Sequence, residues 1–255
     1  MRKASKDGRV EEVKEILRDY GAIIDVNQRN GEEYGCMAAI HLACVFGHDS
    51  IVSLLLAHPA IDVNIKNSSG STPFLIACYN GRTSCARLLL RDSRVLVNEP
   101  TDGGHLPLQR AATWGNIDVI MSWIASGREM ELGKPGVVST DAVGAARKKG
   151  KTEVVTLLER FRENPGETRY QMRVELGLLD EMAAEVFALV VFVSDGLLQI
   201  KDTPSSPWAR FFSIASQLPL ELQMVLCFLQ VESPKEIISG KESEVAFKEL
   251  ARRRW

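Results

Sequence analysis

The feature that most constrains this chain is a pattern that returns every 34 residues. The positions that keep this interval are Gly47, Gly81 and Gly115; Ala43, Ala77 and Ala111; and Asn64 and Asn98. Self-similarity at a period of about 20 to 50 residues is typical of chains that stack one small structural unit several times. We therefore expect a stacked array in which each unit contacts its neighbours.

Each unit contains signals for two short helices. Thr72 followed by Pro73 predicts a helix start, because threonine caps the first turn and proline lacks only an amide that is unpaired there anyway. The recurring glycine predicts a left-handed residue where this first helix ends. Second helices are expected at 50–57, 84–91 and 117–125, and they are too apolar to be stable with one face in water. Neighbouring units must therefore bury them.

The two ends of the array depart from the regular pattern. The stretch from Gly8 to Asn27 matches the second half of an opening unit. The stretch from Thr140 to Leu158 matches a closing unit, in which Gly150 comes one residue late. We count five units, of which the first and last are atypical because terminal units expose one side to water.

Several positions recur together as a motif. Taken together, the units approximate the pattern Thr-Pro-Leu-His-x-Ala, then Gly-His, then Val-x-Leu-Leu, then Asp-Val-Asn, and the match is clearest at His41–His48 and Ile51–Asn64. This pattern resembles the ankyrin repeat over about residues 1–163. The resemblance implies an all-α solenoid of about five helix-turn-helix units. It also implies a non-enzymatic scaffold that binds a protein partner through its concave face and turn tips.

The resemblance also indicates which positions would meet a partner. They are the two residues before each recurring glycine and the turn tips: Tyr34, Met37, Val45, Phe46, Ser68, Ser69, Ser71, Tyr79, Asn80, Asp102, Gly103, His105, Thr113 and Trp114. Phe46, Tyr79 and Trp114 give each middle unit an aromatic side chain, a residue type enriched in binding hot spots. The alternative is that these three rings pack internally, against neighbouring helices or the C-terminal segment.

Residues 164–255 lack the repeat and form a separate region or an extension of the stack. The break is at Asn164-Pro165-Gly166, after which apolar spacing predicts one long helix at 167–193 and further helices at 208–215, 219–229 and 242–253. An Asp-Gly pair at 195–196 leaves a hairpin as the alternative for Val186–Ile200. We favour a helix, since the upstream period continues into it.

One segment of this region has a second resemblance. Leu218-Pro219-Leu220-Glu221-Leu222, followed by Leu226, resembles the opening of an F-box, which docks on the adaptor of a cullin-type ubiquitin ligase. The resemblance implies a substrate adaptor whose contacts are Leu218, Pro219, Glu221, Leu222 and Leu226. The spacing differs, because an F-box reaches its closing tryptophan sooner than Trp255. The plainer interpretation is an amphipathic helix that begins at a proline and packs in a core.

Composition narrows the function classes. With 31 Lys and Arg against 33 Asp and Glu, the net charge is −2, which argues against nucleic-acid binding. We find no apolar run long enough for a membrane span and no signal peptide. Five cysteines, an odd number, fit a reducing compartment, so we expect a cytoplasmic or nuclear protein, presumed monomeric.

Catalytic and metal-binding patterns are missing from the sequence. The four histidines, His41, His48, His58 and His105, do not combine with other residues into a known catalytic or zinc motif. His41 and His48 occupy repeat positions where the family uses histidine to bond turn backbone. We therefore expect no enzyme activity, no cofactor and no metal, and a protein partner as the ligand.

Overall fold

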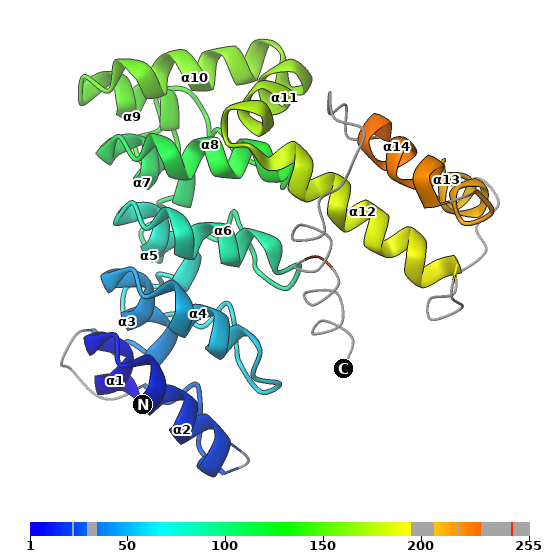
Figure 1. Ribbon diagram of the computed structural model, residues 1–255. Coiled ribbons are helices and arrows are strands. Elements are labelled where there is room, and N and C mark those ends of the chain that lie inside the picture. Colours follow the sequence, from blue (N-terminus) through cyan, green and yellow to red (C-terminus); the bar gives the residue numbers. More distant parts are fainter. Residues whose placement is uncertain (22, 30–34, 195–206, 219, 231–245, 247–255) are drawn as a thin grey trace. The chain divides into compact units, whose positions relative to one another are not determined.

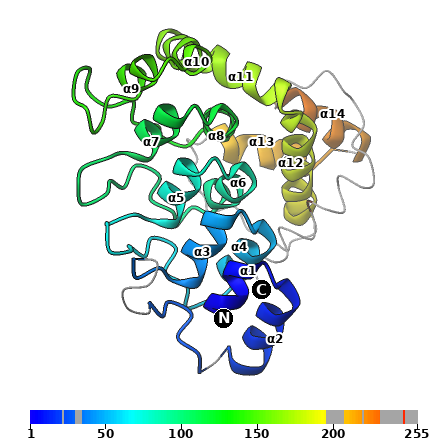
Figure 2. The same cartoon turned by 90° about the vertical axis from the view of Figure 1, so that its left-hand side faces the viewer.

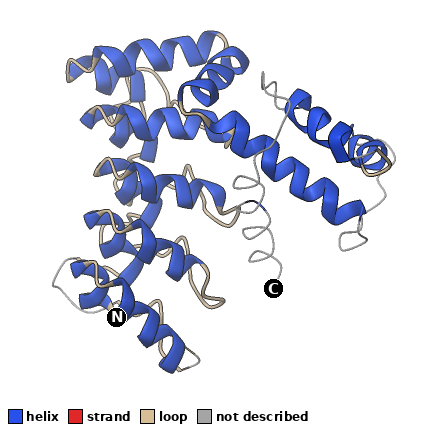
Figure 3. Cartoon of the chain, viewed as in Figure 1, coloured by secondary structure: helices blue, strands red, loops and turns tan. Residues whose placement is uncertain are grey.

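The computed structural model describes the chain except for residues 22, 30–34, 195–206, 219, 231–245 and 247–255. The described residues are helical and contain no strand (Figure 3). The helices are α1 (Arg2–Asp7), α2 (Val10–Tyr20), α3 (Ala39–Phe46), α4 (Asp49–Leu56), α5 (Pro73–Tyr79), α6 (Thr83–Arg91), α7 (Pro107–Trp114), α8 (Ile117–Ser126), α9 (Ala142–Lys148), α10 (Thr152–Glu163), α11 (Pro165–Glu175), α12 (Leu178–Ser194), α13 (Pro207–Ala215) and α14 (Leu220–Gln230).

The chain divides into two compact units, Met1–Met172 and Arg173–Trp255. In the first, helices α1 to α10 form five antiparallel pairs that stack in order (Figure 1). The first helices of successive pairs contact one another, and so do the second helices. Long loops connect the pairs and project to one side of the stack (Figure 2). The all-α repeat solenoid predicted from the sequence is confirmed.

Local signals in the sequence determine where the first helices begin and end. The Thr72 hydroxyl accepts a hydrogen bond from the Leu75 amide at 3.2 Å, and Pro73 occupies the first turn of α5. Gly47 and Gly115 follow α3 and α7 in the left-handed conformation, with φ of 81° and 75°. Each closes the helix by donating its amide to a carbonyl of the last turn.

The recurring glycine has a second role, because a side chain of the next unit lies against it. At Gly81, an added Cβ would be 2.7 Å from Oδ1 of Asn116. The side-chain Nδ2 of Asn116 donates to the backbone carbonyls of Cys78 and Tyr79, at 2.8 and 3.0 Å. The glycine therefore lets the next unit satisfy carbonyls that the end of α5 leaves unpaired.

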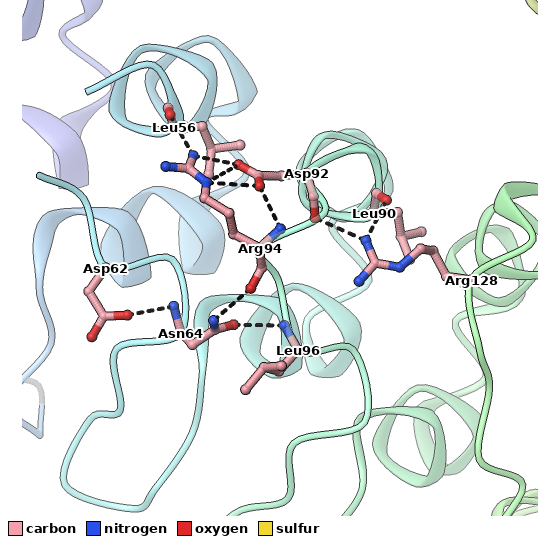
Figure 4. Close-up of polar contacts among 8 residues, drawn as sticks. All are labelled: Leu56, Asp62, Asn64, Leu90, Asp92, Arg94, Leu96 and Arg128. Carbon is pink, nitrogen blue, oxygen red and sulfur yellow. Dashed lines mark hydrogen bonds and ion pairs between the residues drawn. The ribbon is translucent and has the colours of Figure 1, made fainter. Parts of the chain in front are cut away.

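Asparagine side chains join consecutive units on the loops that follow the second helices. Asn64 donates from Nδ2 to the Arg94 carbonyl and accepts from the Leu96 amide, both at 2.8 Å (Figure 4). Asn98, 34 residues later, makes the equivalent pair with the Glu129 carbonyl and the Glu131 amide, at 3.4 and 3.1 Å. Each amide thus bonds backbone of the following unit.

Arginine side chains reinforce these joints. Arg94 donates to the Leu56 carbonyl of the preceding unit at 2.8 Å and forms an ion pair with Asp92 at 2.6 Å. Arg128 repeats the arrangement one unit on, donating to the Leu90 and Asp92 carbonyls at 3.2 and 2.9 Å (Figure 4). These carbonyls belong to the ends of second helices, which lack partners within their own helix.

Apolar side chains fill the space between stacked units. The second helices are buried as predicted: Ile51, Leu55, Leu89 and Ile120 are fully inaccessible to solvent. Phe74 of α5 and Trp123 of α8 meet edge to face, with ring centroids 4.9 Å apart. The core is therefore continuous along the array, as a repeat stack requires.

Two predicted elements differ from the structure. The opening unit is a complete helix pair, since α1 precedes Gly8, where the sequence predicted only a second half. Its six residues carry too few apolar positions to be recognised as a helix. The single helix predicted at 167–193 is wrong: it divides into α11 and α12, because Gly177 has a φ of 65° that an α-helix does not accommodate.

The second unit contains α12, α13 and α14, which pack around Ala183, Phe187, Ala188 and Cys227. For Val186–Ile200 the sequence favoured a helix over a hairpin, and residues 186–194 are helical. Residues 195–200 lie outside the described residues. Most of the helix expected at 242–253 also lies outside them. Among the described helices, none has the length and apolar character needed to cross a membrane. That residues 1–163 and 164–255 are separate domains stays a prediction.

Candidate functional site

An open groove of about 610 Å³ lies against the first helices of the second, third and fourth units. Its floor is α5, through Leu75, Ile76 and Tyr79. Val45 of α3 and Arg110 of α7 line it from the neighbouring units. The remaining described lining residues, apart from Asn80 directly after α5, are on the connecting loops: Met37, Asn67, Ser69, Ser71, Thr101, Gly103 and His105.

Internal hydrogen bonds organise the loops that border the groove. Oδ1 of Asn67 accepts from the amides of Ser69 and Ser71, at 3.0 and 2.9 Å. The next loop closes in the same way, with the Thr101 hydroxyl accepting from the His105 amide at 3.1 Å. The Asp102 amide donates to the Ser69 carbonyl at 3.2 Å and joins the two tips. The loops therefore present ordered hydroxyl and carbonyl groups to the groove.

An aromatic pair and a cation lie together at one side of the groove. The rings of Tyr79 and Trp114 meet edge to face with centroids 5.4 Å apart. The guanidinium carbon of Arg110 lies 5.9 Å from the centroid of the Tyr79 ring, within range of a cation–π contact. Tyr79 and Trp114 remain 40% and 54% exposed, so both rings are accessible to a ligand.

The imidazole of His105 lies on the same side. Burial lowers the pKa of His105, and the nearby Arg110 charge lowers it further. An interaction with the side chain of Gln109, in the first turn of α7, opposes this lowering. Arg110 is the only lining residue, among those described, that carries a full charge.

The groove brings together many of the residues predicted from the sequence. Those that line it are Met37, Val45, Ser69, Ser71, Tyr79, Asn80, Gly103 and His105. Trp114 borders it through the Tyr79 ring. Ser68, Asp102 and Thr113 lie beside it, and the Thr113 hydroxyl bonds the Gln109 carbonyl at 2.7 Å. Tyr34 lies outside the described residues.

Phe46 is the predicted aromatic that the groove does not include. Its ring stacks on His48, with centroids 6.3 Å apart, and it is 41% exposed. The row of three aromatic side chains thus divides into an isolated Phe46 and the contacting pair of Tyr79 and Trp114. That any of these residues binds a partner stays a prediction.

Five lining residues were missed by the sequence analysis: Asn67, Leu75, Ile76, Thr101 and Arg110. Leu75 and Arg110 are one helical turn before Tyr79 and Trp114, so they share a helix face with the predicted residues. Asn67 and Thr101 are 34 residues apart and directly precede the predicted loop tips. Adding the residues up to one helical turn before each predicted position would have found most of the five.

The predicted role of His41 is confirmed by its contacts. Its Nδ1 accepts from the Ala38 amide at 3.0 Å and Nε2 pairs with the Ile65 carbonyl at 2.8 Å. Burial lowers the pKa of His41 to about 4, so the ring is neutral at pH 7. His48 similarly pairs with the Lys6 carbonyl at 3.0 Å. Both histidines connect backbone segments, and in His41 both ring nitrogens are engaged.

The F-box-like segment lies in the second unit. On α14, Leu222 is 50% exposed, whereas Leu226 packs against the apolar core of that unit. Leu218, the first residue of the F-box-like segment, lies between α13 and α14. Its carbonyl accepts a hydrogen bond from Nε2 of Gln223 at 2.9 Å. Pro219 lies outside the described residues, and so does the side chain of Glu221. The adaptor role stays a prediction.

Clusters of the kind that hold metals are not found among the described side chains. His, Cys, Asp and Glu do not gather there in threes. Cys44, Cys78 and Cys85 are buried within the array, and burial raises the pKa of Cys78. These thiols act as small apolar groups in the core.

Comparison with known families identifies the stack. Residues 40–131 match the family model for ankyrin repeats in three copies. This segment contains α3 to α8 and every described residue of the groove except Met37. Residues 40–131 therefore contain ankyrin repeats, which are protein-interaction modules.

Curated relatives share the repeats within much longer chains. The tyrosine-protein kinase HTK16 of Hydra vulgaris is 30% identical over 118 residues, which cover 45% of this chain and 15% of the relative. The SMC5-SMC6 complex localization factor protein 1 of Bos taurus is 27% identical over 169 residues, covering 62% and 16%. The chain spans less than a fifth of either relative's length.

Proposed function

We propose that this protein binds an extended segment of a partner protein in the groove against α5. The observation that carries the proposal is that the groove collects exposed aromatic, amide and hydroxyl groups from three consecutive repeats. Aromatic side chains beside organised hydrogen-bonding groups are what a peptide backbone and its side chains require. A scaffold role follows, in which binding itself is the activity.

A photo-crosslinking residue placed in the groove tests this function directly. We would replace Tyr79 by p-benzoylphenylalanine in the full chain and irradiate it in a cell lysate. The matched control carries the same crosslinker at Leu96, which is 54% exposed and lies outside the groove. The proposal expects a discrete crosslinked protein from Tyr79 alone. Equal products from both positions, or none from Tyr79, would contradict it.

A ubiquitin-ligase adaptor is a second candidate function. It is favoured by the exposed Leu222 within the F-box-like segment, since an exposed leucine on a helix offers an apolar contact. In this proposal the array holds the substrate and α14 holds the ligase. Replacing Leu222 by aspartate should abolish recovery of cullin components with the tagged chain. Replacing Val174, 49% exposed on α11, is the matched control.

A further inference from the structure

The strongest unexplained feature of the groove is the unneutralised charge of Arg110. Its side chain is half-buried on α7, and the Tyr79 ring is its aromatic neighbour at 5.9 Å. Among the described lining residues, none is a carboxylate. Some other arginines of the array pair with carboxylates, such as Arg94 with Asp92 and Arg147 with Glu159, and Arg82 and Arg128 donate to backbone carbonyls. A partly desolvated guanidinium without an anion favours a ligand that supplies one.

Polar side chains of His105 and Gln109 lie near Arg110. Gln109 is 5% exposed, and its side chain interacts with the His105 imidazole. His105 lines the groove directly, and its imidazole is close enough to Arg110 for the two to interact electrostatically. A ligand placed beside Arg110 would therefore also lie next to His105.

We propose that the groove selects partner segments carrying an aspartate or glutamate, whose carboxylate pairs with Arg110 next to His105. This inference rests on the proposed function and specifies the chemistry of its ligand. A single guanidinium suits a monovalent carboxylate, whereas phosphorylated segments are generally recognised by clusters of arginines. The Tyr79 ring holds the guanidinium in place and also provides an apolar surface for a side chain adjacent to the acidic one.

The test uses a displayed library of random ten-residue peptides selected against the full chain. Three proteins are compared: the parent, Arg110→Glu, and Lys148→Glu. Lys148 is exposed on α9 outside the groove, so its substitution changes the net charge equally. We expect the parent and Lys148→Glu to enrich Asp or Glu at one peptide position. Arg110→Glu should lose that preference and enrich Lys or Arg there instead.

A second measurement keeps the inference testable if Arg110→Glu does not fold. A selected peptide and its Asp→Asn or Glu→Gln form are titrated against the parent by calorimetry. The loss of a charge-assisted contact should weaken binding about 10-fold. Arg110→Gln should weaken binding of the acidic peptide to a similar extent. It should not further weaken binding of the neutral peptide.

The outcomes separate the inference from the function it rests on. Selected peptides without an acidic position, or the same acidic preference in Arg110→Glu, would overturn the inference and leave groove binding in place. Peptides that bind Tyr79→Ala as tightly as the parent would contradict groove binding itself, and the inference with it. A urea unfolding curve for each variant establishes that it is folded.

Discussion

Tyr79 and Trp114 belong to successive repeats, and their rings meet edge to face with centroids 5.4 Å apart. Tyr79 is two residues before Gly81 and Trp114 is one residue before Gly115, so the rings belong to adjacent repeat positions, and their contact arises from the stacking of α5 against α7. It also orients the Tyr79 ring that lies beside Arg110.

We expect Trp114→Ala to weaken partner binding although Trp114 is not itself a lining residue. The edge-to-face pair is worth about 0.5–1.5 kcal/mol, so losing it should lower affinity about 2- to 10-fold by freeing Tyr79. Trp114→Phe keeps a ring edge and should bind nearly as well as the parent. Calorimetry with a selected peptide measures both. Equal losses in the two variants would mean that the indole contacts the partner directly.

The asparagine joints give a graded stability prediction. Asn64→Ala removes two bonds of 2.8 Å and leaves the Leu96 amide without its partner. We expect the free energy of unfolding to fall by about 1–2 kcal/mol. Asn98→Ala should cost less, because its bonds are longer at 3.4 and 3.1 Å. Urea unfolding ranks the two variants, and the reverse order would contradict the assignment.

Gly81 and Gly150 test the second role of the recurring glycine. Both have positive φ, 64° and 66°, so an alanine at either site costs about 1–2 kcal/mol in backbone strain. At Gly81 the new Cβ also displaces Asn116, whereas at Gly150 nothing lies within 4 Å. Gly81→Ala should therefore be the more destabilising by about 1 kcal/mol or more. Equal melting temperatures would show that the Asn116 contact contributes nothing.

His41 makes stability depend on pH. Its pKa is lowered to about 4 in the folded chain, while the unfolded side chain keeps the ordinary value near 6.5. The unfolded state therefore binds more protons between these values, and stability falls as pH decreases through that window. The loss from pH 7 to pH 5 should be about 2 kcal/mol. His41→Gln should lack this component when unfolding is measured at both pH values; an unchanged slope would contradict it.

The sequence predicted the array better than it predicted the groove. The repeat signals at Thr72, Gly47 and His41 act within one unit or on the next loop, so their spacing is visible along the chain. Arg110 was missed because its importance depends on Tyr79, which lies a full repeat away and reaches it only through stacking. Phe46 was included because it matches Asn80 and Trp114 by motif position, although its ring stacks on His48 outside the groove.

If a partner binds in the groove against α5, substitutions of Tyr79 and Phe46 should affect its affinity differently. Tyr79 and Phe46 are 40% and 41% exposed at similar repeat positions, but only Tyr79 lines the groove. We would measure the dissociation constant of the protein crosslinked at position 79 for the parent and both alanine variants. We expect Tyr79→Ala to weaken binding about 30-fold or more, as for a hot spot. Phe46→Ala should leave affinity nearly unchanged. Equal effects of the two substitutions, or no effect of Tyr79→Ala, would contradict binding in the groove.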